Sequence, residues 1–297
     1  SFPTRRSSDL ATILSPVGSE EGVFGPLHPD VSAFREHDYV MNVLHELLEE
    51  EAIHGLPSDC EAKVEKMKLG DQLSAEDKGL IQQVLGENLD VFAFSKEELT
   101  VTHLMTHSIP SSDHPPIAQR PYRLSFQEQL AEKKDVERLL RLGLIEPNFG
   151  PWCSPVIMVP KKEPGEFRFT VDYRHINAIT RKDETLLPRI DETLDRLGTS
   201  RVFSRLDLLQ GFWQVPMDPQ DLDKTTFCTR YGNFAFKVMP MGLCNAPRTF
   251  SRLMTQVMAG KEDYVLVYLD GVIIHSRNVR EHARHLEATF EALRKAG

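Results

Sequence analysis

Two aspartates stand where predicted strands end, and both are candidates for binding a metal ion. Asp207 directly follows the predicted strand 202–206, and Asp270 follows the predicted strand 264–269. Carboxylates that leave neighbouring strands and meet across a sheet can bind divalent cations, which prefer hard oxygen ligands. Two such cations about 4 Å apart can support phosphoryl transfer. Each aspartate alone is weak support, because a strand-terminal aspartate is more often a turn residue.

A basic cluster precedes these aspartates on a predicted hairpin. It consists of Lys161, Lys162 and Arg168, with the turn at 161–165. Lysine offers a point charge and arginine a forked donor, so the cluster suits a triphosphate. A solvated turn explains the same residues equally well. The aromatic residue Phe212 could close over a sugar ring, although an aromatic at such a position is most often part of the core.

Other kinds of site find little support in the sequence. His282 and His285 have helical i, i+3 spacing, but without a third ligand we do not expect a metal there. We find no glycine-rich phosphate loop and no Ser/His/Asp arrangement. The four cysteines are far apart and form no C-x-x-C pair. This argues against a disulfide framework or a zinc site and favours a reducing, intracellular compartment, either cytoplasm or nucleus.

Composition and charge describe a globular protein with two unlike parts. Of the 297 residues, 40% are hydrophobic and 27% charged, and no run of about 18 apolar residues suggests a membrane span. The net charge of -9 is uneven: it is -12 over residues 1–100 and +3 over residues 101–297. We therefore expect two units with different partners.

Hydrophobic periodicity and capping residues predict the α+β frame that would position these side chains. We expect helices near 40–48, from Ser74, from Ser125 to Gly143, at 188–198, from Pro247 and near the C-terminus. We expect strands at 154–159, 167–171, 202–206, 233–238, 264–269 and 272–275. The dipeptide Asp270-Gly271 between the last two strands is a strong hairpin signal.

The order of several segments adds a family resemblance. The segments are SPVIMVPKK (154–162), FRFTVDYRHIN (167–177), LPRIDE (187–192), FSRLDLLQGFWQV (203–215), KTTF (224–227), VMPMGLCNAP (238–247) and YLDG (268–271). This series closely resembles the reverse transcriptase of gypsy-type LTR retrotransposon polyproteins, over roughly residues 70–297. The resemblance implies a right-hand polymerase with an antiparallel palm sheet.

The resemblance also implies a division of the chain. Residues 122–297 would form fingers and palm, residues 71–121 a pre-polymerase helix and an extended connector, and residues 1–70 a largely disordered, partly helical acidic region. The thumb and ribonuclease H segments of the family would lie beyond Gly297. Expected partners are an RNA or DNA template with its primer and deoxynucleoside triphosphates, with no membrane, and the oligomeric state stays open.

Carried over residue by residue, the resemblance gives each candidate a role. Asp207 resembles the first metal-binding aspartate, and Asp270 the first aspartate of the Tyr-Xaa-Asp-Asp turn, where two Mg²⁺ ions (or Mn²⁺) are expected. The expected nucleotide-binding residues are Lys161 and Arg168 at the phosphates, Phe212 at the sugar, and Met241 and Gly242 near the nucleotide and template.

One departure from the family pattern concerns the metal site itself. The family has aspartate where this sequence has Gly271, so one metal loses a ligand and a compensating negative charge. We expect the fold and the nucleotide clamp to survive while polymerisation is severely impaired. Two alternatives stay open: a non-catalytic nucleic-acid-binding or interaction protein that reuses the palm scaffold, and a translated relic without function.

Overall fold

The structure is a computed structural model that describes most of the chain after residue 62. The described residues are 63–64, 67, 69–70, 73–163, 165–184, 197–198, 200–268 and 271–297. All of them belong to one compact unit, residues 36–297. The predicted helix near 40–48, most of the predicted helix 188–198 and the candidate ligand Asp270 lie outside the described residues.

The candidate metal ligand Asp207 ends a strand of a three-stranded antiparallel sheet. Its strands are β4 (Val202–Asp207), β8 (Gly271–Ser276) and β7 (Val265–Tyr268), in the order β4-β8-β7. Side chains alternate along a strand, so the sheet has two unlike faces. We call the face that carries Phe203, Arg205 and Asp207 the Asp207 face, and the face that carries Val202, Ser204 and Leu206 the helix face.

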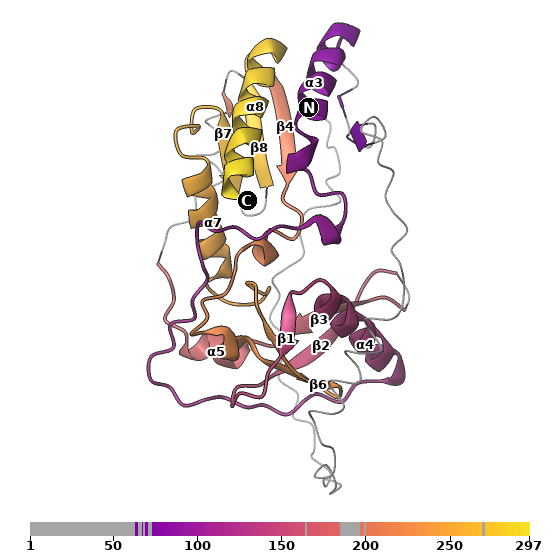
Figure 1. Cartoon of the computed structure of the whole chain (residues 1–297), viewed down its shortest axis with the longest axis vertical. Helices are drawn as coiled ribbons and strands as arrows, with labels where there is room; N and C mark the ends of the chain where they lie inside the picture. The colour runs from indigo at the N-terminus through magenta and orange to yellow at the C-terminus, as the bar shows by residue number, and fades with distance from the viewer. Residues whose placement is uncertain are drawn as a thin grey trace, which may run out of the picture. The chain divides into compact units, whose positions relative to one another are not determined.

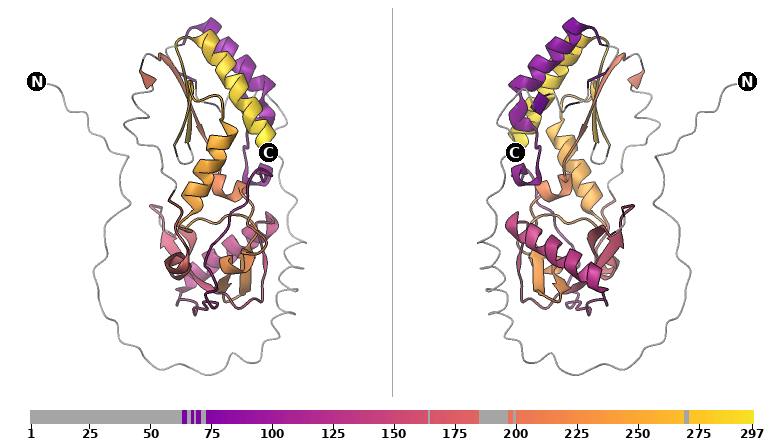
Figure 2. Two further views of the ribbon diagram at one scale, coloured as in Figure 1. Left: turned by 90° about the vertical axis from the view of Figure 1, so that its left-hand side faces the viewer. Right: turned by 90° about the vertical axis from the view of Figure 1, so that its right-hand side faces the viewer.

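Helices cover the helix face of this sheet. Helix α8 (Val279–Ala296) packs on β8 and β4, and α3 (Ala75–Glu87) lies beside α8 (Figures 1 and 2). Helix α7 (Ala246–Val257) packs on β7. The predicted start of α3 is confirmed, because the Ser74 hydroxyl accepts a hydrogen bond from the Asp77 backbone N–H at 3.1 Å.

A buried chain of serines and histidines fastens α8 to the sheet. The His282 ring lies 2.7 Å (Nε2) from the Ser204 hydroxyl on β4 and 2.9 Å (Nδ1) from the Ser276 hydroxyl on β8. Ser276 also lies 2.8 Å from Nδ1 of His285, whose ring stacks on Tyr264 with 3.8 Å between centroids. The histidine pair noted in the sequence therefore joins a helix to its sheet.

The basic cluster belongs to a second sheet, of five strands. Its strands are β1 (Ile145–Pro147), β6 (Gly232–Phe236), β5 (Phe227–Thr229), β2 (Ser154–Pro160) and β3 (Phe167–Val171), in that order. All neighbouring pairs are antiparallel except β2 and β5. The core residue Phe227 contacts the rings of Phe169, Phe234 and Phe236.

Two helices accompany the five-stranded sheet. Helix α4 (Phe126–Arg141) packs on β1, β2 and β3, and the short α5 (Arg174–Ile179) follows β3 (Figure 1). The predicted capping box of α4 is confirmed: Ser125 and Glu128 each accept a hydrogen bond from the other's backbone N–H. Gly143 follows the helix with a positive φ of 67°, as a glycine terminator should.

The segment after α3 is bound to the C-terminal helix. It contains the 3₁₀ turns η1 (Leu89–Val91) and η2 (Lys96–Glu98). Arg294 of α8 forms a two-bond ion pair with Asp90, at 2.5 and 2.8 Å. The Phe92 ring meets Phe290 of α8 edge-on at 5.1 Å, and the Thr102 hydroxyl donates to the Ala296 carbonyl at 2.6 Å. Two further 3₁₀ turns are η3 (Gly211–Gln214) and η4 (Leu222–Thr225).

The predicted pairing of the two strands is confirmed, but Gly271 lies in a strand rather than in the turn. Tyr268 of β7 pairs with Gly271, which is the first residue of β8. The dipeptide signal placed glycine in the turn, whereas strand pairing holds it in extended backbone. The short strands β1 and β5 were not predicted, because three residues are too few to show a period. None of the described helices is long and apolar enough to cross a membrane.

The buried histidine chain predicts that stability falls in acid. Burial lowers the pKa of His282 from 6.5 to about 4, with His285 and His275 contributing. The unfolded chain therefore takes up a proton that the folded chain does not, so stability is complete above pH 6.5 and is lost as the pH falls toward 4. We expect a loss of about 1–2 kcal/mol from this residue between pH 7.5 and pH 5, measured by urea unfolding.

Matched variants isolate this contribution. His282→Gln should flatten the dependence of unfolding free energy on pH, whereas His103→Gln, at an exposed position, should leave it unchanged. The dependence should not vanish, because burial also lowers the pKa of His107 to about 4. An unchanged pH slope in His282→Gln would contradict the prediction.

Candidate active site

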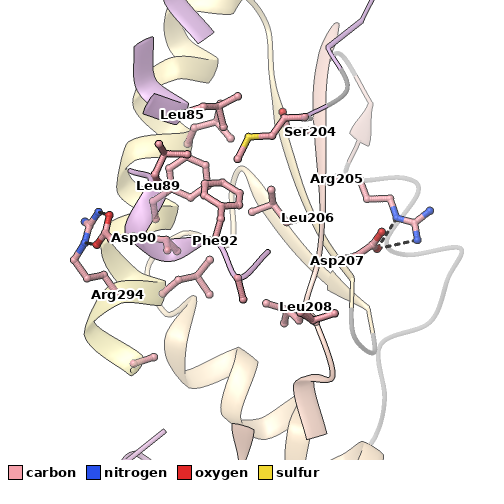
Figure 3. Close-up of a pocket in the computed structure, with 18 of the residues that line it drawn as sticks. Leu85, Leu89, Asp90, Phe92, Ser204, Arg205, Leu206, Asp207, Leu208 and Arg294 are labelled. Atoms are coloured by element: carbon pink, nitrogen blue, oxygen red, sulfur yellow. Dashed lines mark hydrogen bonds and ion pairs between the residues drawn. The ribbon is translucent and has the colours of Figure 1, made fainter. Parts of the chain in front are cut away.

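Asp207 is exposed at the end of β4, on the side away from the helices. Its side chain is 71% exposed and shares the Asp207 face with Arg205, two residues earlier. Nε of Arg205 donates to Oδ1 of Asp207 at 3.0 Å, and Nη2 lies 2.9 Å from the same oxygen in an ion pair. Figure 3 shows this pair on one side of β4, with Leu206 on the other. Among the described residues, no donor contacts Oδ2 of Asp207.

The β4–β8 register fixes what faces this carboxylate. Asp207 lies directly opposite Gly271, which in turn pairs with Tyr268 on β7. Directly opposed residues of an antiparallel pair project their Cβ atoms to the same face, about 4.5–5.5 Å apart. A side chain at position 271 would therefore stand beside Asp207. Asp270 precedes this position in the chain but is not described, so its convergence with Asp207 stays a prediction.

This corner suits a hard divalent cation. It presents a carboxylate that is 71% exposed, and Mg²⁺ prefers one or two carboxylates while keeping several waters. The donor chemistry at Asp207 therefore fits the expected ion.

A large cavity of about 980 Å³ lies nearby, but its character is different. It is lined by α3, the segment after it, α7, α8 and the whole length of β4, with Arg205 and Asp207 included. Figure 3 shows apolar side chains in it, among them Leu85, Leu89, Phe92 and Leu206, with the Asp90–Arg294 pair at its margin. Asp207 stands at the edge of this lining, and its carboxylate points toward Arg205, on the other side of β4 from the apolar side chain of Leu206.

The basic cluster lies on the exposed tip of the β2–β3 hairpin. Val159 pairs with Arg168, and Lys161 donates its backbone N–H to Glu166, so Lys161 and Arg168 share one face of the hairpin. Lys161, Lys162 and Arg168 are all exposed. Nζ of Lys161 bonds Oε2 of Glu166 at 2.8 Å. The structure thus confirms the hairpin, while the nucleotide-binding role stays a prediction.

An ion pair between a buried aspartate and an exposed arginine lies at the base of this hairpin, and sequence reasoning did not single it out. The Asp172 side chain is 2% exposed and accepts bonds from Arg174 at 2.7 and 2.8 Å and from the Tyr122 hydroxyl at 2.9 Å. The Arg174 hydrogen bonds outweigh burial and hold the pKa of Asp172 at about 2. Asp172 and Arg174 both lie in the motif segment 167–177, but nothing in the sequence indicated that Tyr122 would bond to Asp172.

Phe212 is half-buried in η3 and is partly a packing residue. Its ring packs against Phe250 of α7, with 5.4 Å between centroids. The preceding Gly211 is required by this contact, because a Cβ there would lie 2.7 Å from Phe250 Cζ. Gln210 turns the chain with a positive φ of 49°. The core interpretation and the sugar-contact interpretation both remain compatible with a half-buried ring.

Met241 and Gly242 lie in a loop that one side chain holds from both ends. Met241 is 51% exposed, and Gly242 has a φ of 98°, which favours glycine. Asn177 of α5 donates to the Gly242 carbonyl at 2.8 Å and accepts from the Cys244 N–H at 2.8 Å. Asn177 thus links the segment 167–177 to the segment 238–247, a role that the sequence pattern did not indicate.

Comparisons with known proteins agree with this geometry. A family model described as "Reverse transcriptase (RNA-dependent DNA polymerase)" matches residues 159–297. An "RNA-directed DNA polymerase homolog" of Oenothera berteroana is 43% identical over 129 residues, 42% of this chain and 91% of that protein. The "Retrovirus-related Pol polyprotein from transposon 297" of Drosophila melanogaster is 33% identical over 231 residues, which cover 76% of this chain.

Solved structures show the same fold at lower identity. A foamy viral protease-reverse transcriptase in complex with dsDNA superposes with a TM-score of 0.69 and 22% identity, over 84% of this chain and 51% of that one. The present chain spans about a fifth of the length of the fly polyprotein, with 22% of it covered.

The two-sided contact of Asn177 generates a stability prediction. Asn177→Ala leaves the Gly242 carbonyl and the Cys244 N–H without their partner, and each lost bond costs about 0.5–1.5 kcal/mol. We expect a loss of about 1–3 kcal/mol in the free energy of unfolding, measured with urea. His175→Ala, at an exposed position of the same helix, is the control and should change it by less than about 0.5 kcal/mol. Equal effects of the two substitutions would contradict a stabilising role of the two Asn177 hydrogen bonds.

Proposed function

The chain belongs to the reverse transcriptase family, and on that premise we propose that it is the fingers-and-palm part of an RNA-directed DNA polymerase from a gypsy-type retrotransposon polyprotein. The observation that carries the proposal is the exposed Asp207 carboxylate at the end of β4, directly opposite the start of β8 and on the face of β4 opposite α8. The order of the motifs supports the gypsy-type assignment.

In this proposal the three-stranded sheet is the palm and Asp207 and Asp270 are the catalytic carboxylates. They would hold two Mg²⁺ ions, or Mn²⁺, which lower the barrier for the primer 3′-hydroxyl to attack the incoming nucleotide's α-phosphate. Asp207 contributes an exposed oxygen that no described donor contacts. The backbone of β4 and β8 fixes the direction of its side chain, because both strands are hydrogen-bonded along their length.

The five-stranded sheet forms the fingers, and its β2–β3 hairpin holds the nucleotide. Lys161 and Arg168 share an exposed hairpin face that suits a triphosphate. Phe212 contacts the sugar with the free part of its ring, and Met241 and Gly242 contact the base pair through the loop that Asn177 holds. Glu166 neutralises Lys161 until phosphate competes for it.

The polymer partner is a primer annealed to an RNA or DNA template. The foamy viral relative is described in complex with dsDNA, and we extend that partner to this chain. The uneven charge supports the extension, because residues 101–297 carry a net +3 against -12 for residues 1–100.

We also retain the predicted division of the chain after residue 70 and after residue 121. Residues 71–121 include α3 and Phe92, which both contact α8, so this part of the chain supports the palm.

Gly271 makes the encoded metal site incomplete. Its position faces Asp207, so an aspartate there would add a third carboxylate, with its Cβ about 5 Å from that of Asp207, close enough for the two to share a cation. Glycine adds neither an oxygen ligand nor a charge. Gly271 has extended backbone within β8, which any residue can adopt, so restoring a side chain does not strain the hairpin.

Restoring this carboxylate tests the proposed function. Gly271→Asp should raise the rate of Mg²⁺-dependent primer extension by at least about 100-fold over the encoded chain, a change of about 2.7 kcal/mol in activation free energy. Asp207→Asn in the Gly271→Asp background should return the rate to the starting level.

Two other outcomes would overturn part of the proposal. Equal and robust extension by the encoded chain and by the Gly271→Asp variant would contradict the impairment. Absence of turnover in Gly271→Asp, together with retained duplex binding in a gel-shift assay, would favour the non-catalytic nucleic-acid-binding alternative.

The proposed fingers clamp predicts an effect on nucleotide affinity. In the Gly271→Asp background, Arg168→Ala should raise the KM for deoxynucleotides at least tenfold with a smaller change in kcat, because a charge-assisted bond to phosphate is lost. Lys162→Ala is the matched control, since Lys162 is an exposed lysine of the turn itself. Similar KM values for the two variants would contradict the assignment of Arg168.

A further inference from the structure

Arg205 occupies one oxygen of the candidate metal ligand. Its Nε and Nη2 converge on Oδ1 of Asp207 at 3.0 and 2.9 Å, so both forks of the contact use one atom. The two residues are spaced i, i+2 on one strand, which puts their side chains on the same face. Both residues of this ion pair belong to β4, so no other strand or helix is required to bring their charges together.

Among the residues that the structure describes, Asp207 is the one anionic partner of the guanidinium on this face. The residue opposite Arg205 is Ile273, and the residues on either side of it along the face are Phe203 and Asp207. Of the residues that the three described strands contribute to the Asp207 face, Asp207 is the only acidic one. The position facing the aspartate is Gly271, which offers no competing carboxylate.

A divalent cation at Asp207 would have to compete with this guanidinium. A cation held by either oxygen of this carboxylate would lie only a few ångströms from the guanidinium nitrogens, where like charges repel. The Arg205 side chain is 74% exposed, so it is free to swing away when the cation binds.

We propose that Arg205 is a built-in competitor for the divalent cation at Asp207, which weakens metal binding until the guanidinium is displaced. The inference rests on the proposed function, because it takes Asp207 as a metal ligand. Arg205 should weaken metal binding more in this chain than it would if position 271 were an aspartate, because Gly271 supplies no negative charge to offset the guanidinium.

The test is a direct measurement of Mn²⁺ binding to the full 297-residue chain by electron paramagnetic resonance at low ionic strength. Arg205→Gln should tighten the Asp207-dependent binding about two- to fivefold, the range that exposed ion pairs contribute. Arg201→Gln is the matched control, because it removes an exposed arginine that lies six residues before Asp207. It should change binding by less than about 1.5-fold.

A double substitution separates this inference from the proposed function. If Asp207→Asn leaves Mn²⁺ binding unchanged, the proposed metal site is wrong. If Asp207→Asn weakens binding but Arg205→Gln does not tighten it beyond Arg201→Gln, only the competition is wrong. In the Asp207→Asn background, Arg205→Gln should have no effect, and an equal gain there would assign its influence to net charge rather than to competition at Asp207.

Discussion

The antiparallel pairing of β4 with β8 is the constraint on which the candidate site depends. It sets Asp207 opposite Gly271 and gives one sheet face to charged residues and the other to the core. A slip of one residue would turn Asp207 toward α8 and bury a carboxylate without a partner. The helix face opposes such a slip, because Ser204 and Ser276 must both reach His282.

The same constraint explains how the proposed loss of a carboxylate at position 271 would leave the fold intact. Gly271 lies on the Asp207 face, and the buried neighbours Val272 and Ile274 pack on the helix face. Because the core contacts of the sheet lie on the helix face, a change of side chain on the Asp207 face costs them little. The exposed Arg205 then becomes a larger fraction of the charge near Asp207.

The second sheet is linked to the site by contacts between motifs far apart in the chain. Asn177 joins α5 to the loop at Gly242, and the Tyr173 hydroxyl donates to the Thr225 carbonyl at 2.7 Å from a fully buried position. These bonds make the segments 167–177 and 238–247 one structural unit. A nucleotide bound there would be positioned by residues that do not touch it.

The sequence alone determined what local rules can determine. Caps predicted the starts of α3 and α4, and the strand pattern predicted a strand at 202–206 directly before Asp207, because these signals depend on neighbours within a few residues. Only the tertiary structure decided that Gly271 is a strand residue facing Asp207, that Arg205 bonds this carboxylate, and that Asn177 and Tyr122 support the site. Pairing register and long-range hydrogen bonds depend on which distant segments meet in space. The residues within each segment do not indicate which other segment it will contact.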